Sequence, residues 1–134
     1  PHAAAAREGV EITLGAFQAP VAERLIAEGA GGVLVPLNER QLMIDLMAQL
    51  GLPVLLVARS GLGTINHTLL SLEALRRRRL EVVGVVVNGP KNPANEEALA
   101  HFGQVQVLAA VEPLAHCNPE GLRAAYDRYF GDQA

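Results

Sequence analysis

The chain has 134 residues, and 50% of them are hydrophobic, which is enough for one compact domain with a buried core and too little for two. Its formal net charge of -3 argues against a general binder of nucleic acids or membrane surfaces, because such proteins usually carry a basic excess. The single cysteine, Cys117, excludes an intrachain disulfide and fits a reducing compartment, so we expect a cytoplasmic protein.

The N-terminal sequence contains neither a basic-then-apolar leader nor a long apolar run, so no signal peptide and no membrane-spanning helix are expected. The sequence starts at Pro1 without an initiator methionine, from which we expect that upstream residues have been removed.

The first third of the chain predicts one strand and one helix. Residues 17–32, FQAPVAERLIAEGAGG, predict a short amphipathic segment that runs into a strand over Arg24–Ala27, which the following glycines end. In residues 38–51, NERQLMIDLMAQLG, leucines and methionines recur at helical spacing. Gly51 stands where a helix C-cap belongs, so this segment predicts a helix.

The rest of the chain alternates between apolar strands and helices. Residues 52–58, LPVLLVA, form a continuous apolar run that is typical of a strand covered on both faces, and residues 63–79 then show the period of a helix. Further strands are predicted over 80–90 and 105–113, and further helices over 92–103 and 118–130. The four arginines at 76–79 fall in a last helical turn, where cations complement the helix dipole, and so do not indicate nucleic-acid binding.

This alternation predicts an α/β fold with a doubly wound, mostly parallel sheet and helices on both faces, formed by residues 1–134 as a single domain. In such sheets ligands bind at the carboxyl ends of the strands. The polar and glycine-rich segments that follow the predicted strands are therefore the candidate site: Glu28, Ser60–Asn66, Asn88 and Pro113–Glu120.

Glu28 follows the first predicted strand and precedes Gly29, an arrangement that lets backbone approach a ligand while the carboxylate meets a hard cation such as Mg²⁺. A tight turn with a solvated glutamate explains the same residues. A dinucleotide-binding glycine turn fits less well, because a helix should follow it and VLVPL does not supply one.

The loop with Gly61 and Gly63 leads into a predicted helix whose free first-turn amides favour an anion, either a carboxylate or a phosphate. Simple N-capping by Ser60 or Thr64 is the alternative. His67 has no second metal-type residue at i+4, so it is interpreted as a surface or packing histidine.

Asn88 ends an apolar strand, where its amide can pair with a purine edge or form an Asx-turn with Gly89. Cys117 has no histidine at a diagnostic spacing and is interpreted as incidental.

Four segments together, EGAGGVLVPLNE, DLMAQLGLPVLLVARSGLGTINHTLLSLEAL, GVVVNGP and EPLAHCNPE, closely resemble the C-terminal part of dethiobiotin synthetase, in order and at fitting separations. The opening PHAAA is similar to a Ser-Pro-His segment in that family. The resemblance implies a cytoplasmic, homodimeric ligase of biotin biosynthesis that uses ATP and Mg²⁺. Its substrates would be 7,8-diaminononanoate and CO2, from which it closes the ureido ring of dethiobiotin.

The resemblance also implies roles for individual residues. Glu28 would be a magnesium ligand, and Gly29, Ala30 and Gly31 would lie along the nucleotide and the diamine. The adenine would contact Asn88 and Gly89, the backbone of Pro113, Leu114 and Ala115, and Glu120. The helix start at Leu62, Gly63, Thr64, Ile65 and Asn66 would receive the substrate carboxylate across a two-fold dimer interface.

One departure from the family pattern is large. The family's P-loop, a Gly-rich turn ending in Gly-Lys-Thr, has no counterpart in these 134 residues, nor have the lysine and aspartate that follow it. We therefore expect this chain to be inactive alone and to act with a P-loop half, which can be a separate polypeptide. The alternative is a non-catalytic binding or dimerisation domain derived from the same fold. A relative of the amidotransferases or chromosome-partitioning ATPases fits less well, because GLGTINH argues against it.

Overall fold

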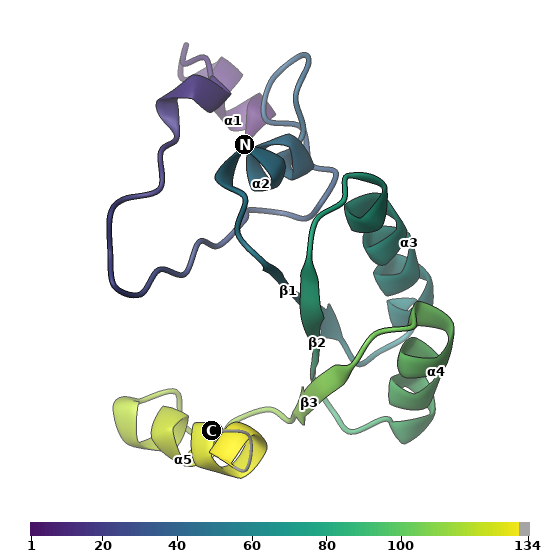
Figure 1. Cartoon of the computed structure of the whole chain (residues 1–134). Coiled ribbons are helices and arrows are strands. Elements are labelled where there is room, and N and C mark those ends of the chain that lie inside the picture. Colours follow the sequence, from purple (N-terminus) through teal and green to yellow (C-terminus); the bar gives the residue numbers. More distant parts are fainter. Residues whose placement is uncertain (132–134) are drawn as a thin grey trace. The chain divides into compact units, whose positions relative to one another are not determined.

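The computed structural model describes residues 1–131 (Figure 1). Its elements, in chain order, are α1 (His2–Arg7), the 3-10 helix η1 (Leu14–Ala16), α2 (Met43–Leu50), β1 (Val54–Arg59), α3 (Thr64–Arg77), β2 (Val82–Asn88), α4 (Pro93–Gly103), β3 (Val107–Val111) and α5 (Pro119–Phe130). They form two compact units. The first unit contains residues 1–52 and 74–81, and the second contains residues 53–73 and the chain from Val82 onward. That residues 1–134 form a single domain stays a prediction.

The second unit is built on a three-stranded parallel sheet in the order β1-β2-β3. The strands are in register at their carboxyl ends, where Arg59 pairs with Asn88 and Asn88 pairs with Val111. Helices connect the consecutive strands, as parallel pairing requires. The predicted α/β class with a parallel sheet is therefore confirmed, and the three strands predicted after residue 52 are present.

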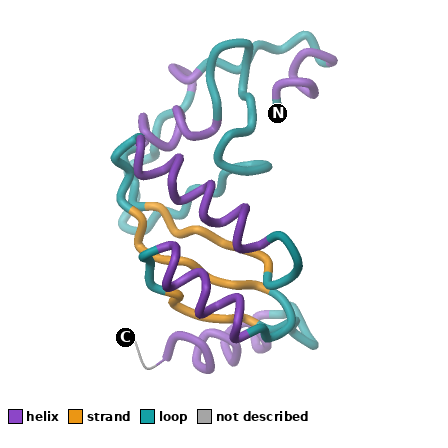
Figure 2. The backbone as a smooth tube through the Cα atoms, turned by 90° about the vertical axis from the view of Figure 1, so that its right-hand side faces the viewer, coloured by secondary structure: helices purple, strands orange, loops and turns teal. Residues whose placement is uncertain are grey.

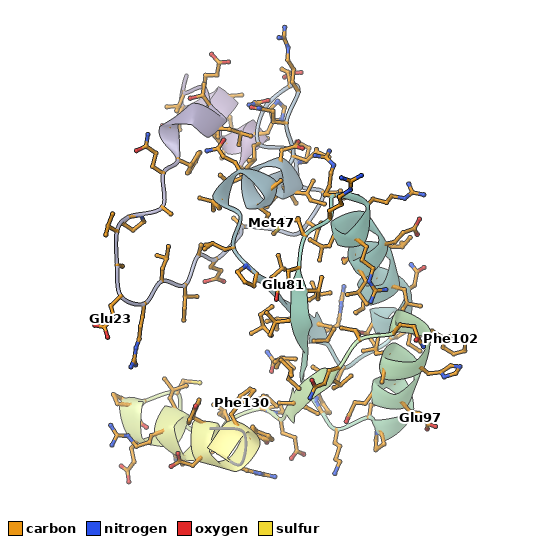
Figure 3. The ribbon with its side chains drawn as sticks, in the orientation of Figure 1. Glu23, Met47, Glu81, Glu97, Phe102 and Phe130 are labelled. Carbon is orange, nitrogen blue, oxygen red and sulfur yellow. The ribbon has the colours of Figure 1, made fainter. Side chains whose placement is uncertain are left out.

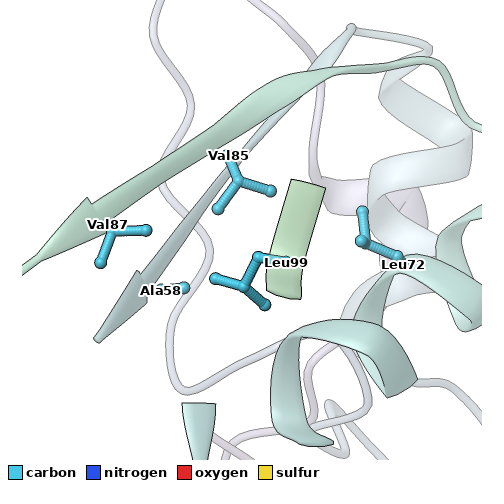
Figure 4. Close-up of a cluster of buried hydrophobic side chains, with 5 residues drawn as sticks. All are labelled: Ala58, Leu72, Val85, Val87 and Leu99. Atoms are coloured by element: carbon cyan, nitrogen blue, oxygen red, sulfur yellow. The ribbon is translucent and has the colours of Figure 1, made fainter. Parts of the chain in front are cut away.

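Helices lie on both sides of this sheet. Figure 2 shows α3 and α4 in front of the strands and α5 behind them. On the α3 and α4 side, Leu72 and Leu99 pack against Val85, Val87 and Ala58, and all five are buried (Figure 4). Burying aliphatic side chains of this size stabilises a fold by about 1.5 to 3 kcal/mol each, so this cluster is the main core of the unit.

The other face of β1 differs from the sequence prediction. The run over residues 52–58 predicts a strand covered on both faces, but Leu55 and Val57 are 50% and 62% exposed. Side chains alternate between the two faces of a strand, so Leu56 and Ala58 reach the core while their neighbours do not. The helix on this side, α5, contacts β3 and leaves β1 open. Among the described residues, β1 is thus covered on one face only.

Local capping explains where three helices begin or end. In α4 the side chain of Asn92 accepts a hydrogen bond from the amide of Asn95 at 3.2 Å, and in α5 that of Asn118 accepts one from Gly121 at 2.8 Å. Each cap is followed by a proline, which suits the first helical position. α2 ends at Gly51, which has the left-handed conformation expected of a C-cap.

The first unit contains a smaller core and a long loop. Leu14, Leu37 and Met43 form the buried cluster. Residues 17–29 adopt neither helix nor strand, so the predicted strand over Arg24–Ala27 and the amphipathic segment before it are wrong.

The physical reason for this error is that a strand exists only when a neighbour supplies hydrogen bonds, and no described strand pairs with this segment. Ile26 is 96% exposed, as expected of an apolar residue without a sheet to pack on. Figure 3 labels Glu23 on this extended loop, with its side chain directed away from the chain.

Candidate functional site

The carboxyl ends of β1 and β2 meet at one edge of the sheet, where backbone hydrogen bonds join the segments that follow them. The amide of Ser60 donates to the carbonyl oxygen of Asn88 at 3.0 Å, and the amide of Gly89 donates to the carbonyl oxygen of Val111 at 2.9 Å. The parallel register therefore continues one residue past β1 and β2. This edge, with the loops that leave it, is called the rim below.

A hollow of about 290 Å³ opens at the rim, lined by Arg59, Ser60, Gly61, Asn88, Gly89, Pro90, Lys91 and Asn92. The structure thus brings the predicted Asn88 and Gly89 together with the loop that precedes α3. Asn88 is exposed, so its amide is available to a ligand as one donor group and one acceptor. Arg59 and Lys91 add two cationic side chains to the same hollow, which suits a ligand with a polar planar group and negative charge.

Arg59, Lys91 and Asn92 were not predicted as site residues. Their signal in the sequence is positional, since each flanks a strand end or a helix start that the alternation pattern predicts. The sequence pattern alone does not distinguish a cation that lines a hollow from one on an open surface. That distinction depends on the loop paths after β1 and β2.

The segment Leu62–Asn66 forms the start of α3. Leu62 is fully exposed at 101%, whereas Thr64 is 2% exposed and its hydroxyl lies 3.5 Å from that of Thr68. Thr64 therefore faces the interior of the unit, and its side chain is not presented to a ligand. The first amides of an α-helix have no partner within the helix, so the exposed start of α3 can accept an anion through its backbone.

The segment after β3 reaches the same rim without lining the hollow. Pro113 and Ala115 are exposed, Leu114 is half-buried, and Glu120 is exposed in the first turn of α5. The amide of Glu112 donates to the hydroxyl of Tyr129 at 3.2 Å, which ties the end of β3 to α5. Cys117 is exposed in this loop.

Glu28, Gly29, Ala30 and Gly31 lie on the long loop of the first unit. All four are exposed. Gly31 has φ of +93°, and a Cβ there would lie 2.9 Å from a methyl group of Val35, so this turn requires glycine.

Within residues 1–131 no group of three or more His, Cys, Asp or Glu side chains is placed to hold a metal ion. Glu28 on its own offers one carboxylate. A Mg²⁺ ion is usually held by one or two carboxylates when phosphate and water supply its other ligands.

The first unit also has a hollow of about 640 Å³ beside α1, lined in part by His2, Glu11, Glu39 and Arg40. None of its lining residues is a predicted site residue. The side chain of Asn38 in its wall donates to the carbonyl oxygen of Ile12 at 2.8 Å and accepts from two backbone amides. The polar groups of the Asn38 side chain thus hold the loop over residues 37–41 in place.

In the first unit, the carboxyl group of Asp45 has a pKa that differs clearly from its ordinary value. The amide of Leu42 donates to its carboxylate at 2.8 Å, and the guanidinium of Arg78 pairs with the other oxygen. The Leu42 hydrogen bond is the larger cause, and with Arg78 it holds the pKa of Asp45 below its ordinary value, against the opposing effect of burial. This arrangement stabilises the start of α2.

A parallel sheet with polar and glycine-rich loops at its carboxyl rim is the architecture of nucleotide-binding α/β domains. The chain belongs to the family described as AAA domain, whose model matches residues 1–121. No helix in the described part of the chain is long and apolar enough to cross a membrane.

Curated relatives are named ATP-dependent dethiobiotin synthetase. The protein of that name from Paramagnetospirillum magneticum is 61% identical over 115 residues, which are 85% of this chain and 56% of the relative. Those from Lawsonia intracellularis and Brucella ovis are 50% and 45% identical, over 81% and 97% of this chain and 54% and 62% of theirs. The resemblance to dethiobiotin synthetase is therefore confirmed, and the chain spans little more than half the length of these relatives.

Proposed function

We propose that this chain forms the nucleotide-base and substrate-carboxylate part of an ATP- and Mg²⁺-dependent dethiobiotin synthetase. The enzyme would close the ureido ring of dethiobiotin from 7,8-diaminononanoate and CO2. The observation that carries the proposal is the meeting of Asn88 and Gly89 with the loop before α3 at one rim. This meeting occurs in a chain that is 61% identical to a relative named for that reaction.

In the proposed reaction, one amine of the diamine adds to CO2 and gives a carbamate. The carbamate oxygen takes the γ-phosphoryl group of ATP, and ADP leaves. The second amine then attacks the mixed anhydride carbon, the ring closes and inorganic phosphate is released. Phosphoryl transfer of this kind depends chiefly on positioning and on neutralising charge.

The residues of this chain have binding and orienting roles in the proposal. Asn88 and Gly89, with Pro113–Ala115 and Glu120 on the loop after β3, hold the adenine. The amides at the start of α3, over Leu62–Asn66, receive the carboxylate of the diamine. Glu28 holds the Mg²⁺ ion, and the backbone of Gly29–Gly31 passes beside the nucleotide and the diamine.

Two partners complete the proposed enzyme. A P-loop half is required because these 134 residues contain no Gly-Lys-Thr phosphate loop, and loss of one preorganised donor typically costs about 3 to 4 kcal/mol of transition-state stabilisation. A second copy of the chain is the other partner. The resemblance to dethiobiotin synthetase implies that its interface lies at the start of α3, over Leu62–Asn66.

The test is reconstitution. The chain is combined with the part of the Paramagnetospirillum relative that it does not span, and ring closure of 7,8-diaminononanoate is assayed with ATP, Mg²⁺ and bicarbonate. We expect dethiobiotin only when both polypeptides, ATP and Mg²⁺ are present. A reconstituted complex that is folded, binds ATP and forms no dethiobiotin would refute the proposal.

The alternative function is a non-catalytic binding or dimerisation domain derived from the same fold. Calorimetry on the same complex distinguishes the two functions. The enzyme binds both ATP and the diamine, whereas the non-catalytic domain binds neither and still self-associates.

A further inference from the structure

A side-chain hydrogen bond from α4 holds the loop that precedes α3. The side-chain amide of Asn95 donates to the carbonyl oxygen of Ser60 at 2.9 Å, across 35 positions of sequence. Ser60 is 3% exposed, so water has little access to replace this donor. The bond therefore fixes the direction in which the chain leaves β1.

Asn95 is itself held in place by the start of α4. Its backbone amide donates to the side chain of Asn92, the N-cap, at 3.2 Å. The carboxylate of Glu96 accepts from the amide of Asn92 at 3.3 Å, which closes the cap from the other side. A side chain in the first turn of a capped helix is a rigid support, so the position of Ser60 is set by α4.

The same loop is attached to the end of β2. The amide of Ser60 donates to the carbonyl oxygen of Asn88 at 3.0 Å, and a Cβ on Gly89 would lie 2.4 Å from the Ser60 hydroxyl oxygen. Ser60 is thus fixed by Asn88 through its amide and by Asn95 through its carbonyl. Four residues further on, α3 begins at Thr64, whose amide donates to the carbonyl oxygen of Gly61 at 3.2 Å.

We propose that Asn95 is a positioning residue that sets the start of α3 against the Asn88–Gly89 turn. It acts through Ser60 and touches neither ligand. If the proposed function holds, Asn95 keeps the carboxylate-binding amides of α3 at a fixed place beside the adenine-binding turn. This consequence therefore rests on the proposed function.

The decisive variant is Asn95→Asp. It keeps the size of the side chain but removes the donor, because a carboxylate only accepts hydrogen bonds and faces the Ser60 carbonyl unfavourably. An acidic residue in the first turn favours a helix, so α4 itself should stay folded. Any change at the Ser60 loop then reflects the lost hydrogen bond and the repulsion between the new carboxylate and the Ser60 carbonyl.

The first measurement is amide hydrogen exchange on the full chain, which needs no activity. We expect residues 60–66 to exchange about fivefold faster in Asn95→Asp, with β3 and the second half of α4 unchanged. The control is Glu97→Ala, at an exposed position of α4 that takes no part in the hydrogen bonds among Ser60, Asn92, Asn95 and Glu96. Unchanged exchange over 60–66 in Asn95→Asp, or equal acceleration in Glu97→Ala, would overturn the inference.

The second measurement is steady-state kinetics of the reconstituted enzyme. We expect the KM for the diamine to rise about tenfold in Asn95→Asp, while the KM for ATP and kcat change less than about twofold. An active wild type with an unchanged diamine KM in the variant would reject the role of Asn95 and leave the proposed function standing. If the wild type forms no dethiobiotin, the proposed function fails, and hydrogen exchange alone still decides whether Asn95 positions the loop.

Discussion

Gly89 and Ser60 face each other so closely at the rim that a Cβ on Gly89 would lie 2.4 Å from the Ser60 hydroxyl oxygen. Gly89 also has φ of +136°, a conformation that side-chain-bearing residues rarely adopt. Two physical constraints therefore require glycine at a position where the sequence alone leaves a purine contact and an Asx-turn open.

We expect Gly89→Ala to destabilise the chain by about 1 to 3 kcal/mol, because it adds backbone strain and a contact with Ser60. Urea unfolding followed by circular dichroism measures the loss. In the double variant with Ser60→Ala the contact is relieved and only the strain remains, so part of the stability should return. A double variant no more stable than Gly89→Ala would show that the contact with Ser60 contributes nothing.

Glu28→Gln tests the proposed metal ligand. In the reconstituted enzyme we expect kcat to fall at least about 100-fold, because a neutral amide is a poor ligand for Mg²⁺. Glu23→Gln is the matched control, since Glu23 is an exposed glutamate on the same loop and has no assigned role. Equal activity of the two variants across a titration of Mg²⁺ would reject Glu28 as the ligand.

Asn66→Ala and Asn88→Ala separate the two proposed ligand positions at the rim. We expect the first to raise the KM for the diamine, because the exposed side-chain amide of Asn66 would donate to the same carboxylate as the backbone amides of α3. We expect the second to raise the KM for ATP, and each effect should be about tenfold. Both residues are exposed, so the loss of either side chain should leave the stability nearly unchanged. If Asn66→Ala changed only the KM for ATP, and Asn88→Ala changed only the KM for the diamine, the assignment would be contradicted.

Asp45 makes the stability of the first unit depend on pH, and the direction of that dependence follows from its lowered pKa. Its folded pKa lies below the ordinary value of 3.8, so its stabilising contribution is complete above that pH and is lost as the pH falls through the folded pKa. We expect Asp45→Ala to cost about 0.5 to 2 kcal/mol at pH 7 and much less at pH 2.5. Urea unfolding at both pH values measures the loss of stability. Glu39→Ala is the control, because it removes an exposed ion pair with His2, and such pairs contribute little to stability. A constant difference between wild type and Asp45→Ala at the two pH values would show that the carboxylate charge is not the cause.

The open face of β1 predicts self-association of the chain. Leu55 and Val57 are adjacent apolar side chains on one exposed face of an edge strand, and such surfaces favour contact with other proteins. We expect the double variant Leu55→Ser, Val57→Thr to shift sedimentation toward monomer, with unchanged circular dichroism. Phe102→Ser on α4 is the control, because Phe102 is 68% exposed on a helix away from β1 (Figure 3). A monomeric wild type would contradict this prediction.

The success of the sequence-based prediction differs between the two units. In the second unit the segments over 52–58, 80–90 and 105–113 contain the observed strands, because each is a continuous apolar run bounded by turn residues. In the first unit the segment Arg24–Ala27 has a similar apolar character and forms no strand. An apolar run predicts a strand only where a neighbouring strand exists to pair with it, and that depends on the rest of the fold.

The candidate site shows the same division. Asn88 and the start of α3 were predicted from their place after apolar strands, and Gly89 from the family resemblance. The structure brings Asn88 and Gly89 together with the Ser60 loop. Arg59 and Lys91 were missed because an exposed cation carries no periodic signal. The placement of Glu28 as a metal ligand stays a prediction.

The parallel α/β class, the helix caps and the family resemblance could be predicted from the sequence, because they depend on residue order and on interactions between near neighbours. The folded arrangement was needed to show that Asn95 reaches Ser60, that Gly89 must lack a side chain, and that one face of β1 is open. Each of these is a contact, or a missing contact, between segments far apart in the chain. Such contacts are set by how the strands and helices pack, which no local pattern of residues specifies.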